Sequence, residues 1–177
     1  MLNLYKYTDK EKEELIKSLV VLVDRREKVN EHIIEWFDKK KIPYKNKSLE
    51  YGDYSFYLPA SEQLHIPTDL YFDHEIMLER KGSLNELSSN MTKDRSRIEK
   101  EFALAPKQKM LLIENASYED IVEGNYDTEY NRKSFLGTLH SWYYKYNMPF
   151  FFLKNNKYSG LFIYMYFQNY LKTNYLR

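Results

Sequence analysis

Two stretches of the chain decide its fold: Leu49-Glu50-Tyr51-Gly52-Asp53-Tyr54 and, further along, Ile76-Met77-Leu78-Glu79-Arg80-Lys81. Each has the apolar and aromatic character of a strand, so Asp53 falls at a turn beside one strand and Glu79-Arg80-Lys81 ends another. If these strands are neighbours, Asp53 and Glu79 can share a divalent metal ion and Lys81 can point at the same place. Phosphodiester hydrolysis uses this combination, with oxygen ligands for Mg²⁺ or Mn²⁺ and a cation near the attacked phosphate. Either carboxylate alone is more often an acidic turn or a solvated strand end, so the prediction depends on the pair.

The composition favours one domain spanning residues 1–177, because this length can bury a sizeable core. The 27 basic residues nearly balance the 26 acidic ones, so any DNA-binding face has to be a local patch. The absence of cysteine excludes disulfides and thiolate metal sites and fits a reducing cytoplasm. Residues 1–14 are too charged for a signal peptide, and the apolar run at 161–167 is far shorter than the roughly 20 residues of a membrane helix. We therefore expect a cytoplasmic protein that does not enter a membrane.

Hydrophobic patterning predicts strands and helices in alternation. The continuously apolar run at 19–23 is typical of a strand buried on both faces. Further strands are predicted at 47–51, 54–58, 75–80, 110–113 and 150–153. Helices are predicted at 9–18, 30–41, 93–104, 128–146 and 159–172, with short helices after Ser83 and Ser117 and a loop at 59–73. This order favours an α/β sandwich around a mixed, largely parallel sheet, in which sites form at the carboxyl ends of strands. Asp24, Glu79 and Glu114 lie at such ends.

Three motifs occur in a fixed order: Val23-Asp24-Arg25-Arg26-Glu27, Gly52-Asp53-Tyr54 and Leu78-Glu79-Arg80-Lys81. Together they resemble the XPF-type nuclease domain of the excision-repair endonucleases, whose hallmark is GD…ERK…D, within the PD-(D/E)XK restriction-like superfamily. The resemblance covers about residues 19–155. It implies a three-layer restriction-endonuclease-like sandwich. An isolated Glu-Arg-Lys is a weak signal, whereas the ordered set with a buried strand before each motif is specific.

The resemblance also implies an activity, namely metal-dependent hydrolysis of branched, forked or flapped DNA in repair or recombination. On this basis Asp53 and Glu79 bind Mg²⁺ or Mn²⁺, and Lys81 orients or activates the attacking water. Asp24 is expected as a further metal ligand or an acid behind the ligands. Arg26 and Glu27 match an Arg-Glu pair of the family. Arg26 and Arg80 are expected to hold a DNA phosphate or to brace the acidic cluster, with a purely structural ion pair as the alternative for both.

The chain departs from the family pattern in two places. The aspartate usual after the lysine is replaced by Asn85, so either Glu86 substitutes for it or the site carries one negative charge fewer. In addition, 25 residues (54–78) separate Asp53 from Glu79, where the family has a tight hairpin. The extra loop would cover the site or grip DNA, and Asp73 and His74 are candidate ligands in it, although ordinary loop surface is the favoured interpretation. The remaining histidines of this loop and of the predicted helices receive the same structural interpretation: His65, His32 and His140.

DNA is the expected partner. Candidate phosphate contacts, with a solvated helix face as the alternative, are Lys93, Arg95, Arg97, Arg132 and Lys133. The chain ends before the helix-hairpin-helix domains of eukaryotic and archaeal relatives, which points to a compact bacterial or phage protein. The last helix carries Phe162, Tyr166 and Tyr170, and we expect these either to complete the core or to form a homodimer.

Three functions compete on these observations. The first is an active structure-specific endonuclease. The second is a non-catalytic DNA-binding subunit that supports an active partner. Asn85 is the kind of change expected in such a subunit, but the retention of Asp53, Glu79 and Lys81 argues against it. The third, a sequence-specific restriction-type enzyme, ranks last because the chain shows no recognition domain.

Overall fold

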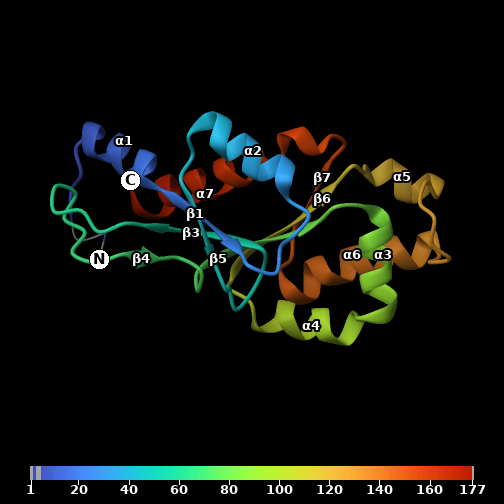
Figure 1. Ribbon diagram of the computed structural model, residues 1–177. Helices are drawn as coiled ribbons and strands as arrows, with labels where there is room; N and C mark the ends of the chain where they lie inside the picture. Colours follow the sequence, from blue (N-terminus) through green and yellow to red (C-terminus); the bar gives the residue numbers. More distant parts are fainter. Residues whose placement is uncertain (1, 3–4, 177) are drawn as a thin grey trace.

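The computed structural model describes residues 2 and 5–176, and Figure 1 shows a twisted sheet with helices on its faces. Within these residues the strands are β1 (Val20–Asp24), β2 (Tyr44–Lys47), β3 (Tyr54–Leu58), β4 (Leu70–Tyr71), β5 (Ile76–Lys81), β6 (Gln108–Glu114) and β7 (Phe150–Leu153). The helices are α1 (Asp9–Ser18), α2 (Glu31–Lys40), α3 (Leu84–Lys93), α4 (Arg95–Leu104), α5 (Tyr118–Glu123), α6 (Arg132–Tyr146), the 3₁₀ helix η2 (Asn156–Tyr158) and α7 (Ser159–Tyr175).

The sheet is mixed, as the alternation of elements predicts. Its order is β2-β1-β3-β5-β6-β7, with β4 beside β3. The pairs β1/β2, β5/β6 and β6/β7 are parallel, while β3 is antiparallel to β1, β4 and β5. The antiparallel β3 reverses the chain, so its beginning meets the carboxyl ends of β1 and β5 at one edge. The predicted α/β fold is therefore confirmed, and its topology gathers the three motifs at that edge.

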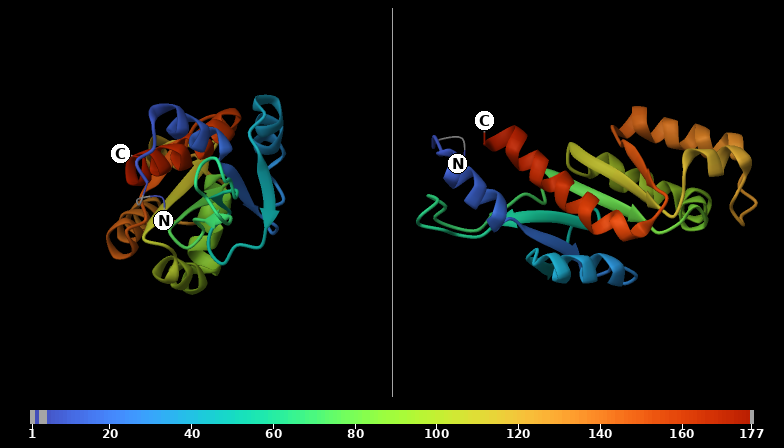
Figure 2. Two further views of the ribbon diagram at one scale, coloured as in Figure 1. Left: turned by 90° about the vertical axis from the view of Figure 1, so that its left-hand side faces the viewer. Right: turned by 90° about the horizontal axis from the view of Figure 1, so that it is seen from above.

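Two apolar clusters cover the two faces of the sheet. The first packs α1, α2 and α7 against core residues such as Val21, Phe56 and Leu78. The second packs α3, α4 and α6 against Met77 and Leu111 on the other face. Figure 1 shows the first group of helices above the sheet and the second below its right-hand half. Figure 2 shows α1 and the end of α7 side by side at one end of the molecule, with α6 at the other.

Some predicted boundaries are wrong. The strand predicted at 47–51 ends at Lys47, and the chain then turns, with Leu49 buried and its amide bound to Asp24. The helix predicted at 128–146 begins at Arg132, since Asn131 caps it by accepting hydrogen bonds from the next amides. The short helix after Ser83 runs as far as Lys93. No helix among residues 2 and 5–176 is long and apolar enough to cross a membrane.

Gly52 is required by the turn that carries Asp53. Its φ is +69°, and a Cβ at this position would lie 2.5 Å from the sulfur of Met77. A side chain would therefore meet both backbone strain and a buried neighbour.

We predict that Gly52→Ala lowers the free energy of unfolding by about 1–3 kcal/mol, because alanine is strained in the left-handed region. Urea denaturation measures the change. The matched control is Gly137→Ala in α6, where nothing lies within 4 Å of the new Cβ. That variant should gain about 0.5–1 kcal/mol. A Gly52→Ala protein as stable as the wild type would show that the turn tolerates a side chain.

Candidate active site

Asp53 and Glu79 meet because β3 and β5 are neighbours. Tyr54 is paired with Leu78, and the Asp53 amide donates a hydrogen bond to the Leu78 carbonyl at 2.9 Å. The Asp53 carboxylate in turn accepts a hydrogen bond from the Arg80 amide at 2.7 Å. The Asp53 carboxylate is thus fixed to β5 at Arg80, the residue that follows Glu79. The sequence-predicted pair is brought together.

Lys81 lies with this pair. Its Nζ donates to Glu79 Oε1 at 2.8 Å and lies 3.7 Å from Glu86 Oε1. The side chains of Lys81 and Glu79 are only 12% and 15% exposed, so their charges are largely removed from water. An ion pair of this kind stays charged only if its partners remain in place.

Burial and mutual repulsion set the protonation of these groups. Burial, with the Glu79 carboxylate adding to it, holds the pKa of Asp53 well above its ordinary value, against the opposing effect of Lys81. Burial tends to lower the pKa of Lys81, but Glu79 and Asp53 outweigh it, so this pKa lies above its ordinary value. The site therefore combines a lysine whose charged form is favoured with a carboxyl group whose ionised form is disfavoured.

The donor set of this site fits a hard divalent cation. The cleft of about 230 Å³ around Asp53 and Glu79 is lined mainly by polar and charged side chains. Among the residues that the structure describes, no group of three or more His, Asp or Glu side chains forms a closed metal site. Mg²⁺ is commonly held by one or two carboxylates and keeps several waters, so two carboxylates suffice for it. Asp53 and Glu79 are the residues that would hold Mg²⁺ or Mn²⁺.

Asp24 differs from the expectation that it is a further metal ligand. Its side chain is 1% exposed, and it accepts hydrogen bonds from the Arg26 amide and Nε, both at 2.8 Å, and from the Leu49 amide at 2.6 Å. Burial tends to raise the pKa of Asp24, but these donors outweigh it and hold the pKa below its ordinary value. Asp24 lines a neighbouring groove rather than the cleft. Its carboxylate is already saturated, and it anchors the turn that leads to Asp53.

Arg80 is a buried brace rather than a surface contact for DNA. The guanidinium is 6% exposed and donates to Glu27 at 2.9 Å and to Glu114 at 2.7 Å. Glu114 is fully buried and also lies 3.0 Å from His32 Nε2. Burial tends to raise the pKa of Glu114, but the hydrogen bonds from Arg80 and His32 hold it below its ordinary value. This network ties the ends of β1, β5 and β6 together behind the cleft.

Asn85 and Glu86, the residues at and after the position of the missing aspartate, have different surroundings. Asn85 donates to the Asp127 carboxylate at 3.0 Å and accepts from the Asp127 amide at 2.9 Å, so it holds the chain before α6. Glu86 lines the cleft, accepts from the Gly82 amide at 2.9 Å and faces Lys81. Besides Glu79, the acid that faces Lys81 is therefore Glu86, and Asn85 lies away from it.

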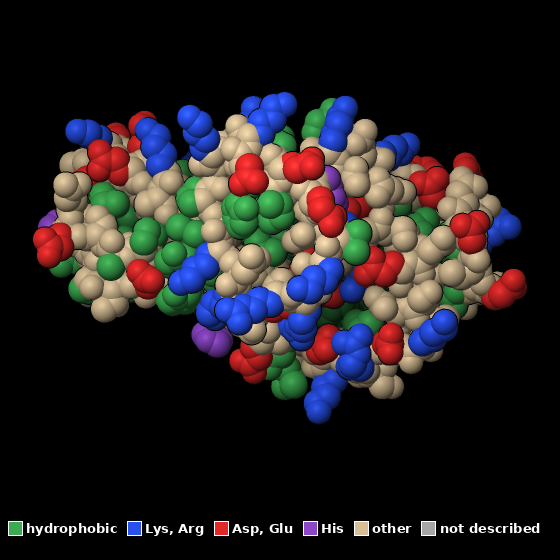
Figure 3. Space-filling view, in the orientation of Figure 1, with side chains coloured by type: hydrophobic (Ala, Val, Ile, Leu, Met, Phe, Trp, Pro, Cys, Tyr) green, Lys and Arg blue, Asp and Glu red, His purple; other side chains and the backbone are tan. Residues whose placement is uncertain are grey.

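The basic candidates divide into those near the cleft and those tied elsewhere. Arg97 lines the cleft and pairs with Glu101 at 2.8 Å, and Arg26 also lines it. Arg95 pairs with Glu99, which also accepts from Trp142 and Tyr146. Arg132 packs over Gly124 and donates to the Val122 carbonyl. The exposed Lys93 and Lys133 lie outside the cleft. Figure 3 shows Lys and Arg side chains gathered near the middle of the view, with acidic side chains among them.

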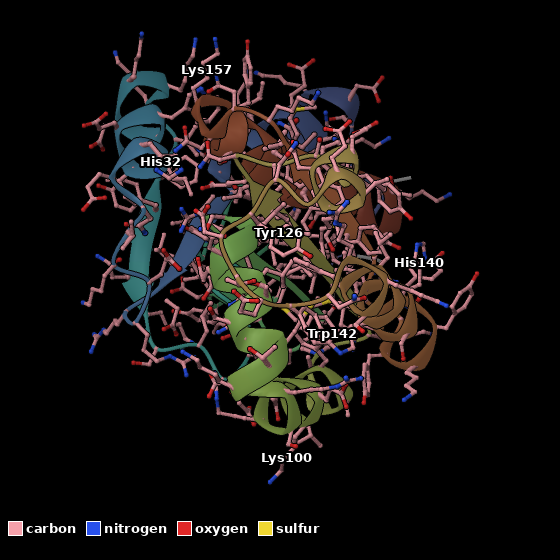
Figure 4. All side chains as sticks on the ribbon, turned by 90° about the vertical axis from the view of Figure 1, so that its right-hand side faces the viewer. His32, Lys100, Tyr126, His140, Trp142 and Lys157 are labelled. Carbon is pink, nitrogen blue, oxygen red and sulfur yellow. The ribbon has the colours of Figure 1, made fainter. Side chains whose placement is uncertain are left out.

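The 59–73 loop does not cover the site. Since β3 runs away from Asp53, the loop lies at the opposite end of β3, near α1. Asp73 is 6% exposed and pairs with Lys47, while His74 is exposed. His65 stacks on Tyr5, and Asp69 accepts from the Ala60 amide. Figure 4 shows His32 on α2 and His140 on α6 well apart, and His140 contacts Tyr118. None of these residues lines the cleft.

Several residues of the cleft had no sequence signal. They are Glu50, Tyr51, Asn90, Ile98 and Glu101. They come from the turn before Asp53 and from one side of α3 and α4. Only the packing of these helices against the sheet brings Asn90, Ile98 and Glu101 to the site, so no motif spacing marked them.

The chain belongs to the ERCC4 domain family, whose model matches residues 23–166. This confirms the predicted membership among XPF-type nuclease domains. Among solved structures, the chain is similar to XPF from Aeropyrum pernix, with a TM-score of 0.61 and 18% identity over 88% of this chain and 62% of that chain. It is also similar to XPF from Aeropyrum pernix in complex with DNA, with a TM-score of 0.61 and 16% identity over 86% and 65%. These likenesses show a shared fold, and this chain spans less than two thirds of either structure. No protein with a curated description matches the sequence.

We predict that Asp53→Asn stabilises the metal-free protein and that the gain grows as the pH rises. The folded pKa of Asp53 is raised, so its ionised form costs stability above that pKa, and asparagine removes this cost. One pKa unit corresponds to about 1.4 kcal/mol, which sets the order of the effect. Thermal unfolding in a chelator from pH 4 to pH 8 measures it.

Asp24→Asn is the matched control with the opposite sign. The folded pKa of Asp24 is lowered, so its stabilisation is present above the unfolded value near 3.9 and is lost as the pH falls through the folded value. Asp24→Asn should cost about 1–3 kcal/mol at neutral pH and less in acid. If both variants shift in the same direction at pH 8, the assignment of these two carboxyl groups is wrong.

Proposed function

We propose that this protein is a divalent-metal-dependent, structure-specific DNA endonuclease that cuts branched, forked or flapped DNA in repair or recombination. The supporting observation is that the Asp53 carboxylate is held on the Arg80 amide, beside Glu79 and the charged Lys81. A buried acid of raised pKa next to a second carboxylate is costly for stability. Such a cost is explained if the two oxygen donors are kept for a cation and a phosphate.

The residues of the cleft have separate tasks in this mechanism. Asp53 and Glu79 would hold the cation, and Mg²⁺ or Mn²⁺ bound there would polarise the phosphate and lower the pKa of a bound water. Lys81, kept charged by Glu79, orients the attacking water and donates to a phosphate oxygen as negative charge develops there. Hydrolysis forms a bond from the water oxygen to phosphorus and breaks the bond to the leaving sugar oxygen. The water loses a proton and the leaving oxygen gains one.

Other side chains position the DNA. Arg26 and Arg97 both line the cleft, where they can neutralise phosphates next to the cut. The buried Arg80 network fixes the strand that carries Glu79 and Lys81. We assign the catalytic role to Asp53, Glu79 and Lys81, and a positioning role to Arg80, Glu27 and Asp24.

We further propose that the protein acts in the cytoplasm and pairs with a second copy through α7 and β7. Phe162, Tyr166 and Tyr170 are partly buried against the first cluster, so they complete the core. The outer side of these elements instead exposes Phe151 (45%), Leu161 (42%) and Met165 (42%). Exposed apolar side chains that lie together are a common dimer contact.

We predict that Asp53→Asn and Glu79→Gln each abolish cleavage of flap and fork DNA while leaving DNA binding within about twofold, because both changes remove a ligand charge and keep the shape. Cleavage in Mg²⁺ or Mn²⁺ and binding in a chelator are measured separately. Mn²⁺ should raise the melting temperature of the wild type but not of Asp53→Asn. Glu129→Gln on the surface is the matched control. Wild-type cleavage by either site variant contradicts the assignment.

We predict that Glu86→Gln raises the metal concentration needed for half-maximal cleavage, because it removes the acid that faces Lys81. Asn85→Asp should not lower this concentration. It should instead cost about 1 kcal/mol, since a second carboxylate would face Asp127. Metal titrations of cleavage and urea denaturation test both variants. A lower metal requirement in Asn85→Asp would show that position 85 serves the site after all.

A further inference from the structure

Helices cover one half of the sheet on a single face only, although Leu22 and Ser55 on the other face are fully buried. The second apolar cluster contains residues of β5, β6 and β7, but none of β1–β4 within the described residues. Figure 1 shows α3, α4 and α6 below β5 and β6, and no helix below β3 and β4 at the left. In this half β3 is antiparallel to β1 and β4, and antiparallel strands commonly leave one face to solvent, where polar side chains are expected. The side chains that this face carries therefore indicate what it can bind.

The side chains on the open face follow from strand alternation. Tyr44 packs on the first cluster, so Lys45 and Lys47 project to the other face. Phe56 and Leu58 are core residues, so Tyr57 also projects to the open face, opposite Tyr71 of β4. We call Lys45, Lys47, Tyr57 and Tyr71 the tyrosine platform.

The platform is a stack of rings flanked by cations. The ring centroids of Tyr57 and Tyr71 are 5.0 Å apart, with an angle of 14° between the planes. The Nζ of Lys45 lies 5.5 Å from the Tyr57 centroid, and that of Lys47 lies 5.3 Å from the Tyr71 centroid. Tyr71 is 38% exposed. Aromatic rings with lysines beside them offer base stacking and phosphate contacts on one surface.

The two lysines of the platform differ in whether a carboxylate neutralises them. Lys47 is paired with Asp73, the acidic group that faces it. Lys45 is exposed and has no carboxylate partner in the described part of the chain. Lys45 lies over the Tyr57 ring but carries no carboxylate, so of the two lysines it is the one available to a phosphate.

The platform lies on the same face as the catalytic groups. Glu79 and Lys81 alternate with the core residues Leu78 and Arg80, so they project to the face that carries Met77. Along β3, Tyr57 is four residues from Asp53, which corresponds to about 13 Å. A DNA strand cut at Asp53 and Glu79 needs only a few nucleotides to reach it.

We infer that the tyrosine platform binds the unpaired single-stranded arm of the DNA substrate, with bases on Tyr57 and Tyr71 and a phosphate on Lys45. The bases of a duplex stack on one another, so only an unpaired strand can place its bases on these rings. This inference rests on the proposed function for the identity of the polymer as DNA. It adds the part of a branched substrate that the protein holds next to the cut.

The test measures binding of a fluorescent oligothymidylate of about 15 nucleotides in a chelator, so that nothing is cut. Tyr57→Leu and Tyr71→Leu should each weaken binding about tenfold. Tyr57→Phe should bind like the wild type, because it keeps the ring. Lys45→Gln, an exposed change, should reduce the slope of log affinity against log salt by about 0.7. Tyr144→Leu on α6, where the ring is 81% exposed, is the matched control and should change neither quantity.

The outcomes separate this inference from the proposed function. Three results would each overturn the platform, even if the protein cuts branched DNA. They are wild-type binding by the leucine variants, an unchanged salt slope in Lys45→Gln, and no binding of the oligonucleotide by the wild type. Loss of binding in the leucine variants with rescue by Tyr57→Phe supports the platform, even if the protein cuts no DNA. If a leucine variant fails to fold, as thermal unfolding would reveal, the Lys45→Gln slope decides alone.

Discussion

The structure depends on one hydrogen bond, which the Arg80 amide donates to the Asp53 carboxylate at 2.7 Å. A carboxyl group largely removed from water beside a second carboxylate is unfavourable unless backbone donors and cations hold it. The turn before β3 meets this demand with Gly52 in the left-handed region and with Asp24, which binds the Leu49 amide. The fold at this edge is therefore organised to keep an acid where it is electrostatically costly.

The end of β5 shows how one short motif serves two faces of a sheet. Because successive side chains alternate, Glu79 and Lys81 project to the cleft while Arg80 projects to the opposite face. There Arg80 is enclosed by Glu27 and Glu114, whose charges compensate its burial. Removing one member of such a network leaves another charge buried and unpaired. Because Glu79, Arg80 and Lys81 are consecutive, such a change at Arg80 would also affect the position of the two cleft residues.

The two halves of the sheet are used differently. Over β5 and β6 both faces are covered, and this half carries Glu79 and Lys81. Over β1 to β4 one face carries tyrosines and lysines in place of a helix. The 59–73 loop extends this open half at the end far from Asp53, which removes it from the site and leaves it beside α1. The inserted loop, which the sequence suggested would cover the site or grip DNA, thus lies at the end of the sheet far from Asp53.

The sequence by itself determined the α/β class, the core strands and the grouping of Asp53, Glu79 and Lys81, because hydrophobic periodicity and short motifs are local properties. It could not decide whether Glu86 substitutes for the aspartate that Asn85 replaces, since that depends on which side of α3 faces β5 and on the contact of Asn85 with Asp127, 42 residues away in the chain. It placed Asp24 with the metal ligands, whereas the tertiary structure commits that carboxylate to Arg26 and Leu49. It gave no sign that His32 and Glu114 would meet, or that Tyr57 and Tyr71 would stack. Such contacts are decided only when distant segments pack, because burial, partner and protonation are properties of the assembled site and not of any stretch of sequence.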